Sequence, residues 1–251
     1  MRLTPDTIVF DIETAPGLYA LFQSGKMYVP PESCIEEPGK IICIAYKWWN
    51  KKRTHCLTWD ENQDDKAMIE EFVEIANSAD ILVAHNGDQF DIKTIRTRCL
   101  KHRIAMMPNY TSIDTLKNCR ALFRMQSNKL NMVAKFLGIP GKMQTGGIKL
   151  WLDVTFGKCP KAFNKMIRYC RRDVTLLEEV FDILNPYMPM RSRVNTCITL
   201  CPWCGSNRLS VNQRRKYTAL GTERVSLKCL DCGKYPPAIA ASRWDAAVAA
   251  V

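Results

Sequence analysis

Two acidic side chains, Asp11 and Glu13, are the first residues of this sequence whose types and spacing suggest chemistry. They end an apolar run that begins at Ile8, and alternate residues of a β-strand point to opposite faces, so both carboxylates emerge on one side. Two carboxylates that close together raise each other's pKa unless a cation lies between them. The motif therefore indicates a divalent metal site with oxygen ligands, although a solvated strand end would contain the same residues.

A second candidate pair, Tyr169 and Asp173, lies far downstream in a long amphipathic segment, 161–184, that is followed by Pro186. The 3.6-residue spacing of its apolar residues predicts a helix, which the proline ends. A separation of four residues places the two side chains one turn apart on one helical face, so they can converge on one site. Alternatively, Tyr169 is a core aromatic residue and Asp173 an exposed acid.

The elements that would position these residues follow a mixed order. Period-two and continuous apolar runs predict strands, and 3.6-residue spacing predicts amphipathic helices. The predicted strands are 8–14, 41–49, 53–59 and 81–84; the predicted helices are 64–78, 89–102, 130–137 and 161–184; and residues 112–116 are predicted to be another strand-to-helix junction. Residues 15–40 are predicted to form a long loop, and residues 85–88 and 143–147 shorter ones. Strands first and alternating units later predict an α/β fold with a mixed sheet.

Composition excludes several classes of protein. The chain has 251 residues, of which 47% are hydrophobic and 24% charged, and no apolar run approaches the length of a membrane span. The N-terminus has no apolar segment typical of a signal peptide, and eight cysteines are scattered singly, so we expect reduced thiols in the cytoplasm, which is the host cytoplasm if a bacteriophage encodes the protein.

The basic charge is concentrated near the C-terminus. The formal net charge is +11, and residues 186–251 contain ten Lys or Arg and three Asp or Glu, a difference of +7. An excess of this kind favours polyanions such as nucleic acid through counterion release, and it also serves solubility. We expect nucleic acid to be the partner.

Four of the cysteines form two Cys-x-x-Cys-Gly motifs with twenty-four residues between them: Cys201, Cys204, Cys229 and Cys232. Four thiolates at this spacing suit one tetrahedral structural Zn²⁺, whereas two disulfides would need an oxidising compartment. A module this small builds little core, so bound zinc would supply its folding energy. The spacing resembles that of a zinc ribbon.

A basic run with an aromatic end lies between the two motifs: Arg214, Arg215, Lys216 and Tyr217. Such a stretch can follow a phosphate backbone while Tyr217, or Trp203 of the first motif, stacks on a base. The alternative is a solvated hairpin whose charges offset those of a zinc tetrathiolate.

Taken together, the acidic motifs resemble the DnaQ-like (DEDD) 3′–5′ exonuclease superfamily of ribonuclease H-like fold. Residues 11–14 match its first motif, residues 86–91 its second and residues 169–173 its third, and residues 113–116 look like its fifth-strand junction. The resemblance spans residues 7–184. The three histidines lie upstream of the third motif, so the chain is similar to the branch with Tyr169 in that position.

The resemblance implies roles for particular residues. Asp11 would bridge two Mg²⁺ or Mn²⁺ ions, Glu13 and Asp173 would complete the ligands of the first ion, and Asp91 would hold the second. Tyr169 would orient the attacking water. The resemblance also implies nucleic-acid contacts, which we expect at Thr14, Asn86 and Phe90.

These expectations combine into a functional prediction. Residues 135–137 and the third motif are most similar to exonuclease domains related to family B DNA polymerases, yet no polymerase follows, which predicts a stand-alone exonuclease acting on DNA in replication, repair or phage DNA metabolism. Alternatives are a 3′–5′ exoribonuclease and a zinc-ribbon nucleic-acid-binding protein with an inactive nuclease domain; a polymerase or repair protein is a further candidate partner. The predicted domains are 1–185, a linker at 186–200, the ribbon at 201–237, and a tail at 238–251 that is a short packed helix or a loose end.

Overall fold

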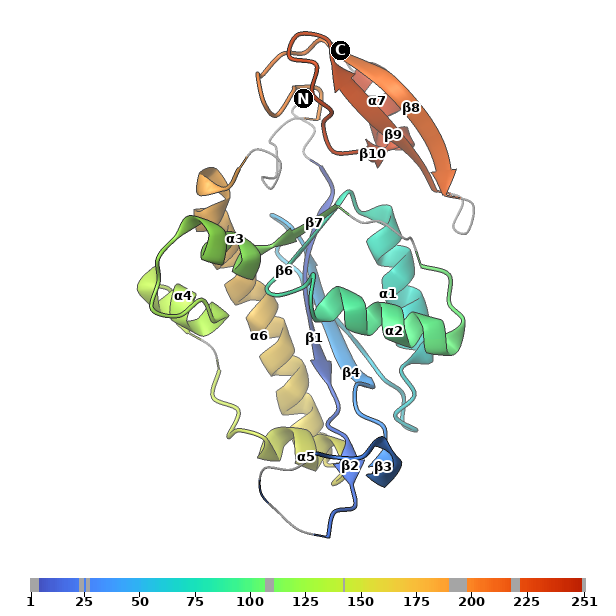
Figure 1. The fold of residues 1–251 in the computed structure, drawn as a ribbon, viewed down its shortest axis with the longest axis vertical. Helices are drawn as coiled ribbons and strands as arrows, with labels where there is room; N and C mark the ends of the chain where they lie inside the picture. Colours follow the sequence, from blue (N-terminus) through green and yellow to red (C-terminus); the bar gives the residue numbers. More distant parts are fainter. Residues whose placement is uncertain are drawn as a thin grey trace.

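The computed structural model describes residues 5–22, 25, 28–106, 111–141, 143–189, 198–217 and 222–249. Its centre is a five-stranded sheet in the order β5-β4-β1-β6-β7 (Figure 1). The strands are β1 (Thr7–Thr14), β4 (Ile41–Trp48), β5 (Thr54–Thr58), β6 (Ile81–Ala84) and β7 (Thr111–Asp114). β1 pairs antiparallel with β4 and parallel with β6, so the sheet is mixed, as predicted.

Helices cover both faces of this sheet (Figure 1). On one face lie α1 (Lys66–Ser78) and α2 (Asp91–His102); on the other lie α3 (Thr115–Leu122), α4 (Leu130–Phe136), α5 (Lys149–Thr155) and α6 (Pro160–Leu184). β1 alternates between the two cores: Ile8, Phe10 and Ile12 pack with α1 and α2, whereas Val9 packs with α6. Asp11 and Glu13 follow the alternation of Val9 and therefore lie beneath α6.

A buried ion pair joins α1, α2 and the start of β4. Asp65 accepts two hydrogen bonds from the guanidinium of Arg98, at 2.7 and 2.8 Å, and others from His102 at 2.7 Å and the backbone N–H of Ile41 at 2.8 Å. Burial by itself would raise the pKa of Asp65, but these hydrogen bonds outweigh it and lower the pKa below its ordinary value of 3.8. This network is structural.

The structure differs from the predicted elements in three places. The predicted loop 15–40 contains a small hairpin of β2 (Leu18–Tyr19) and β3 (Cys34–Glu36), with a 3₁₀ turn, η1 (Pro31–Ser33), before β3. α2 begins at Asp91 rather than at residue 89, because the two residues before it belong to the turn after β6. Helix α5 was not predicted: only seven residues long, it presents too little periodicity to be recognised.

The C-terminal part forms a second, three-stranded sheet in the order β10-β9-β8, made of β8 (Leu209–Tyr217), β9 (Thr222–Cys229) and β10 (Ile239–Ala240), with α7 (Ala241–Ala249) (Figure 1). Trp244 of α7 is buried with Val225, Leu227 and Ile239 in one core. This core joins residues of the predicted ribbon, 201–237, with residues of the predicted tail, 238–251, and we call these parts together the C-terminal module. In the predicted linker, Ile198 belongs to the same core, and residues 190–197 lie outside the described part.

Asp80 fastens this module to the larger domain. Its fully buried carboxylate accepts hydrogen bonds from the backbone N–H groups of Asp6 and Ala240, both at 2.9 Å, and from the guanidinium of Arg243 at 2.6 Å. Arg224 of β9 lies 3.8 Å away and donates to the carbonyl oxygens of Ala79 and Ala238. The contact lies where β1 and β6 begin, before the strand positions that carry the acidic motif.

Among the described residues, no helix combines the length and the apolar character needed to cross a membrane.

Candidate active site

Three carboxylates converge between the sheet and α6. Asp11 and Glu13 come from alternate positions of β1, and Asp173 comes from α6 directly above them; their ligand oxygens lie within 4.8 Å of one another. Glu13 is 9% exposed and Asp173 only 1%. Negative charges this close and this buried repel strongly, so the cluster needs a cation in order to be fully ionised. The acids of the first motif, residues 11–14, and of the third motif, residues 169–173, thus meet at one site.

Asp91, the predicted fourth acid, contacts β1 from α2, which covers the face of the sheet opposite α6. It is the first residue of α2, where the helix macrodipole favours a carboxylate, and it is 2% exposed. Its Oδ1 accepts a hydrogen bond of 3.2 Å from the backbone N–H of Ile12, the residue between Asp11 and Glu13. Asp91 is therefore tied to the first motif, although its oxygens are outside the group of three.

Asp114, at the end of β7, organises the loop that carries the second motif. It accepts hydrogen bonds from the backbone N–H groups of Asn86, at 3.0 Å, and Asp88, at 3.3 Å, and it caps α3 through Lys117 N–H at 3.1 Å. Asn86 has a φ of 73°, in the left-handed region that asparagine tolerates better than most residues. Asp114 therefore orients the turn that delivers Asp91 and is not itself one of the converging acids.

Tyr169 lies one helical turn before Asp173 and packs against Trp151 of α5. The two rings meet edge to face, with centroids 6.0 Å apart and an angle of 77°. The indole N–H of Trp151 donates a hydrogen bond of 3.1 Å to Oε2 of Glu13. Sequence analysis missed Trp151, because it lies in the unpredicted helix α5 and belongs to none of the motifs.

Cys170 supports the site from behind. Its Sγ donates to the backbone carbonyl oxygen of Asp11 at 3.5 Å, which ties α6 to β1 at the acidic motif. Burial, together with the neighbouring thiols of Cys43 and Cys56, raises the pKa of Cys170 well above its usual value. The thiol therefore stays neutral and acts as a packing group and a weak donor.

The predicted nucleic-acid contacts fall into two groups. Thr14 follows Glu13 on β1, Phe90 immediately precedes Asp91 and is 43% exposed, and Asn86 lies in the turn before α2. The second group lies in the C-terminal module: Arg214, Arg215, Lys216 and Tyr217, all within β8.

These β8 side chains have different surroundings. Arg214 makes two hydrogen bonds, at 2.5 and 3.1 Å, to the carboxylate of Asp245 on α7. Arg215 is exposed, and the side chains of Lys216 and Tyr217 lie outside the described part. The bidentate ion pair engages the donors of Arg214 within the module, which leaves Arg215 as the described basic side chain of this run that faces solvent.

The four paired cysteines form one cluster. Sγ of Cys201 lies 3.6 Å from Sγ of Cys232, and Sγ of Cys204 lies 3.6 Å from that of Cys229, so neither pair is a disulfide. Zinc–sulfur bonds of about 2.3 Å in a tetrahedron separate the sulfurs by about 3.8 Å, close to these distances. The backbone N–H of Cys232, despite desolvation, helps to lower the pKa of Cys229 to about 6, whereas the backbone N–H of Ser206 is outweighed by desolvation and the neighbouring thiols, which raise the pKa of Cys204 to about 12. The residues fit a structural zinc ion.

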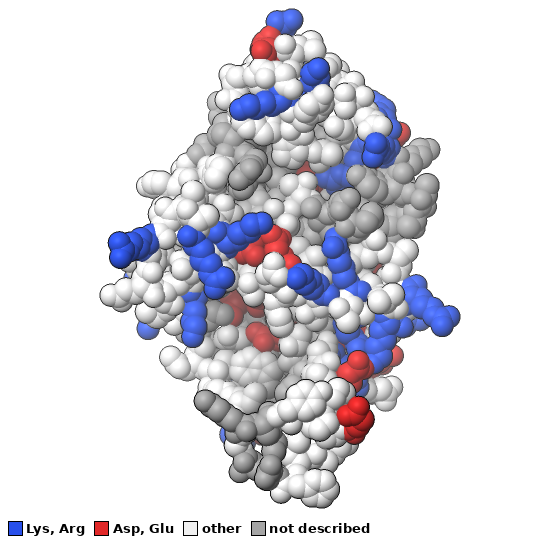
Figure 2. Space-filling model, in the orientation of Figure 1, with Lys and Arg blue, Asp and Glu red and all other residues white. Residues whose placement is uncertain are grey.

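Basic side chains border the acidic site on the face shown in Figure 2. Lys and Arg lie on both sides of a hollow in the middle of this face, and Asp and Glu lie within it. The exposed basic residues of the flanking elements are Lys93, Arg96 and Lys101 of α2, Arg103 directly after it, Lys117 and Arg120 of α3, and Arg124, Lys129 and Lys135 beside or in α4. The rim is positive and the floor negative.

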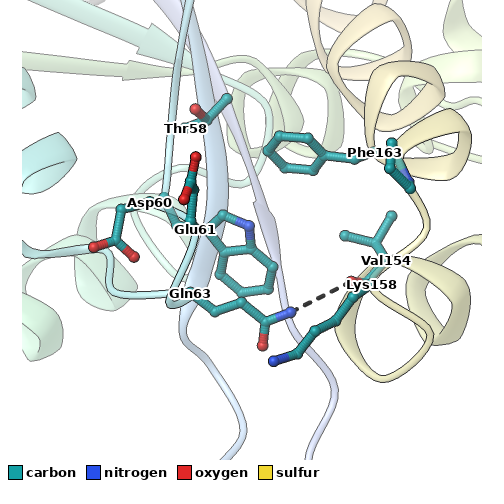
Figure 3. A pocket seen from close by; sticks show the side chains of 9 residues that line it. Thr58, Asp60, Glu61, Gln63, Val154, Lys158 and Phe163 are labelled. Carbon is teal, nitrogen blue, oxygen red and sulfur yellow. Dashed lines mark hydrogen bonds between the residues drawn. The ribbon is translucent and has the colours of Figure 1, made fainter.

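Another cavity, of about 550 Å³, lies between the loop after β5 and the junction of α5 and α6 (Figure 3). Trp59 and Phe163 form part of its apolar wall, and Asp60 and Lys158 lie at its edge. Gln63 reaches across it and donates hydrogen bonds to the carbonyl oxygens of Val154, at 3.4 Å, and Thr155, at 2.8 Å. None of the converging acids lines this cavity, and its described contacts hold the end of α5 in place.

Acids from β1 and α6 converge beneath α6, and Asp91 of α2 is tied to the same strand; the comparisons with known proteins indicate what class of site this is. Residues 33–185 match the family model of the RNase_H superfamily, and the chain belongs to that superfamily. The match begins after β1, so Asp11 and Glu13 precede it.

Two individual proteins are similar to this chain. A PolC-type DNA polymerase III from Ureaplasma parvum is 29% identical over 136 residues, which cover 51% of this chain and 9% of that protein. A family B DNA polymerase from the archaeon Pyrobaculum calidifontis has a similar fold, with a TM-score of 0.53, 18% identity, and coverage of 74% of this chain and 25% of the polymerase chain. The chain therefore spans only a small part of the curated polymerase.

Proposed function

We propose that this protein is a metal-dependent 3′–5′ exonuclease that degrades DNA from single strands or 3′ ends and releases nucleoside 5′-monophosphates. The observation that carries the proposal is the convergence of Asp11, Glu13 and Asp173 within 4.8 Å, with Asp91 tied to the backbone between the first two. Membership of the RNase_H superfamily and the similarity to two DNA polymerases support a DNA-related nuclease.

The donor set suits Mg²⁺ or Mn²⁺. All four candidate ligands are carboxylates, the oxygen donors that both ions prefer, and two of them, Asp91 and Asp173, are almost fully buried, so their charge is hardly screened by solvent. When bound, two such ions would supply activation of the attacking water and stabilisation of the charge on the leaving oxygen.

The chain's own residues have separate tasks in this proposal. Asp11, Glu13 and Asp173 would hold one ion, and Asp11 and Asp91 would hold the other. Tyr169 orients the attacking water through its phenolic hydroxyl, a positioning role. The backbone N–H of Ile12 and the indole N–H of Trp151 hold two of the carboxylates in place before substrate arrives.

The basic rim provides the attraction that the acids cannot. A hollow of about 380 Å³ is lined by Asn86, Gln89 and Lys117, and a second, of about 630 Å³, by His85 and Lys129; both are also lined by Arg120. Asp88 and Asp114 also line the first hollow, where Asp88 lies 3.7 Å from Lys117. The cations and amides continue past them along α3, away from the second motif. This row suits a phosphate backbone whose terminal nucleotide lies at the acids.

The C-terminal module adds a zinc site and part of the positive charge to this proposal. Its contact with the larger domain lies where β1 begins, at Asp6, whereas the acids begin at Asp11. A strand rises about 3.3 Å per residue, so the contact is on the order of 17 Å from the acids. The module would therefore bind DNA away from the cleaved end, and a replication or repair protein is the alternative partner for it.

The test is digestion of 3′- and 5′-end-labelled single-stranded DNA and RNA, side by side, with Mg²⁺. We expect the wild-type protein to release mononucleotides from the 3′ end of DNA, and Asp11→Ala to abolish this release while nucleic-acid binding persists. Asp182→Ala, an α6 acid outside the site, is the control. Degradation of RNA alone would establish an exoribonuclease, and binding without degradation of either substrate would establish a zinc-ribbon binding protein with an inactive nuclease domain.

A further inference from the structure

Trp151 touches two members of the acidic site at once. Its indole N–H donates to Oε2 of Glu13 at 3.1 Å, and its ring meets the ring of Tyr169 edge to face at a centroid distance of 6.0 Å. Glu13 and Tyr169 come from different elements, β1 and α6, and Trp151 comes from a third, α5. It lies 138 residues from Glu13 in sequence.

Helix α5 is held firmly enough to position another group. Leu150 and Val154, on either side of Trp151, are buried in the core beneath α6. At the end of the helix, Gln63 donates hydrogen bonds to the carbonyl oxygens of Val154 and Thr155, across the cavity in Figure 3. The helix that carries the indole is therefore held by the buried side chains of Leu150 and Val154 and by the hydrogen bonds from Gln63.

We propose that Trp151 is a further positioning residue of this site: it fixes the orientation of the Glu13 carboxylate and supports the Tyr169 ring. The indole N–H holds Oε2 of Glu13 and so restrains the direction in which the carboxylate points. A carboxylate so restrained loses little conformational freedom when it binds the ion. Hydrogen bonds to metal ligands of this kind are worth about 10- to 100-fold in metal affinity or activity when removed.

This inference rests on the proposed function, since it assigns Trp151 to the proposed metal site, but its test does not require activity. The measurement is Mn²⁺ binding to substrate-free protein by electron paramagnetic resonance, with Asp11→Ala to identify the site. Trp151→Phe keeps the aromatic edge beside Tyr169 and removes only the N–H. We expect about 10- to 100-fold weaker Mn²⁺ binding and, in the nuclease assay, a higher Mg²⁺ requirement that excess Mg²⁺ relieves.

The chain offers a matched control in Trp49. Its indole N–H donates to the carboxylate of Asp182 at 2.7 Å, and its ring meets Phe181 edge to face at 5.9 Å. Trp49→Phe therefore removes the same kind of indole–carboxylate hydrogen bond, here from an exposed aspartate away from the acids. We expect Mn²⁺ affinity to stay at the wild-type level in this control.

A second measurement covers the case in which Trp151→Phe does not fold. In wild-type protein labelled with ¹⁵N at the indole, Mn²⁺ should broaden the Trp151 signal at low occupancy while that of Trp49 persists. Mn²⁺ affinities that are equal in Trp151→Phe and Trp49→Phe would overturn the proposal, as would equal broadening of the two indole signals. Mn²⁺ binding without nuclease activity would refute the proposed function and leave this inference standing.

Discussion

Replacing Asp80 with Ala should release the C-terminal module from the larger domain. The carboxylate is fully buried and accepts hydrogen bonds from the backbone of Asp6 and Ala240 and from Arg243, with Arg224 at 3.8 Å. Removing one partner of a buried ion pair costs about 3 to 5 kcal/mol. Each of the two backbone N–H groups left without its acceptor adds about 1 to 3 kcal/mol, unless water enters.

The loss falls on the contact between the two parts of the chain, so we expect the module to separate before the larger domain unfolds. Whole domains of this size are stable by about 5 to 15 kcal/mol, and the contact is only one part of that total. Hydrogen exchange of the β10 and α7 amides should therefore become faster in Asp80→Ala, while amides of β1 and β4 keep their protection. Urea unfolding followed by tryptophan fluorescence should change from one transition to two.

Asp245→Ala is the appropriate comparison. Asp245 also pairs with an arginine, Arg214, at 2.5 Å, but its side chain is 52% exposed, and exposed pairs contribute about 0 to 1 kcal/mol. If Asp80→Ala and Asp245→Ala changed exchange and unfolding to the same small extent, burial would not be the source of the effect. The reasoning about Asp80 would then be wrong.

Three further predictions concern single groups. Tyr169→Phe should lower the rate on the order of a hundredfold with Mn²⁺ affinity unchanged, because it removes an orienting hydroxyl and no ligand; a neutral effect in single-turnover kinetics would remove Tyr169 from the mechanism. Asp65 has a folded-state pKa below 3.8 because, despite burial, Arg98 and His102 donate to it, so its contribution to stability is present above about pH 4 and is lost as the pH falls below that value. Urea midpoints should fall more steeply from pH 5 to pH 3 in wild type than in Asp65→Asn, and parallel curves would contradict this. Cys201→Ser, or chelation of zinc, should unfold the module and weaken both DNA affinity and its salt dependence; an unchanged salt slope would show that the module does not bind DNA.

Local regularities allowed much of the site to be predicted from sequence. Alternation along β1 determined that Asp11 and Glu13 share a face, and helical periodicity determined the same for Tyr169 and Asp173, because both depend only on backbone geometry within a few residues. The strands of the central five-stranded sheet and the longer helices followed from the same periodicities. The two Cys-x-x-Cys motifs, likewise local, identified the four sulfurs that the structure brings together.

Other features were decided only by the tertiary structure. Trp151, Asp80 and the bidentate pairing of Arg214 with Asp245 depend on contacts between residues 138, 160 and 31 positions apart, for which no local pattern exists. The C-terminal segment 239–249 has an ordinary Ala-rich sequence, and it is ordered because Trp244 fills a core that β9 provides. The sequence by itself therefore determined which acids and thiols share a face or a turn, since neighbouring residues fix that geometry. Packing between distant segments determined which groups hold those acids in place and where the basic module is attached, since burial and pairing exist only once the chain has folded.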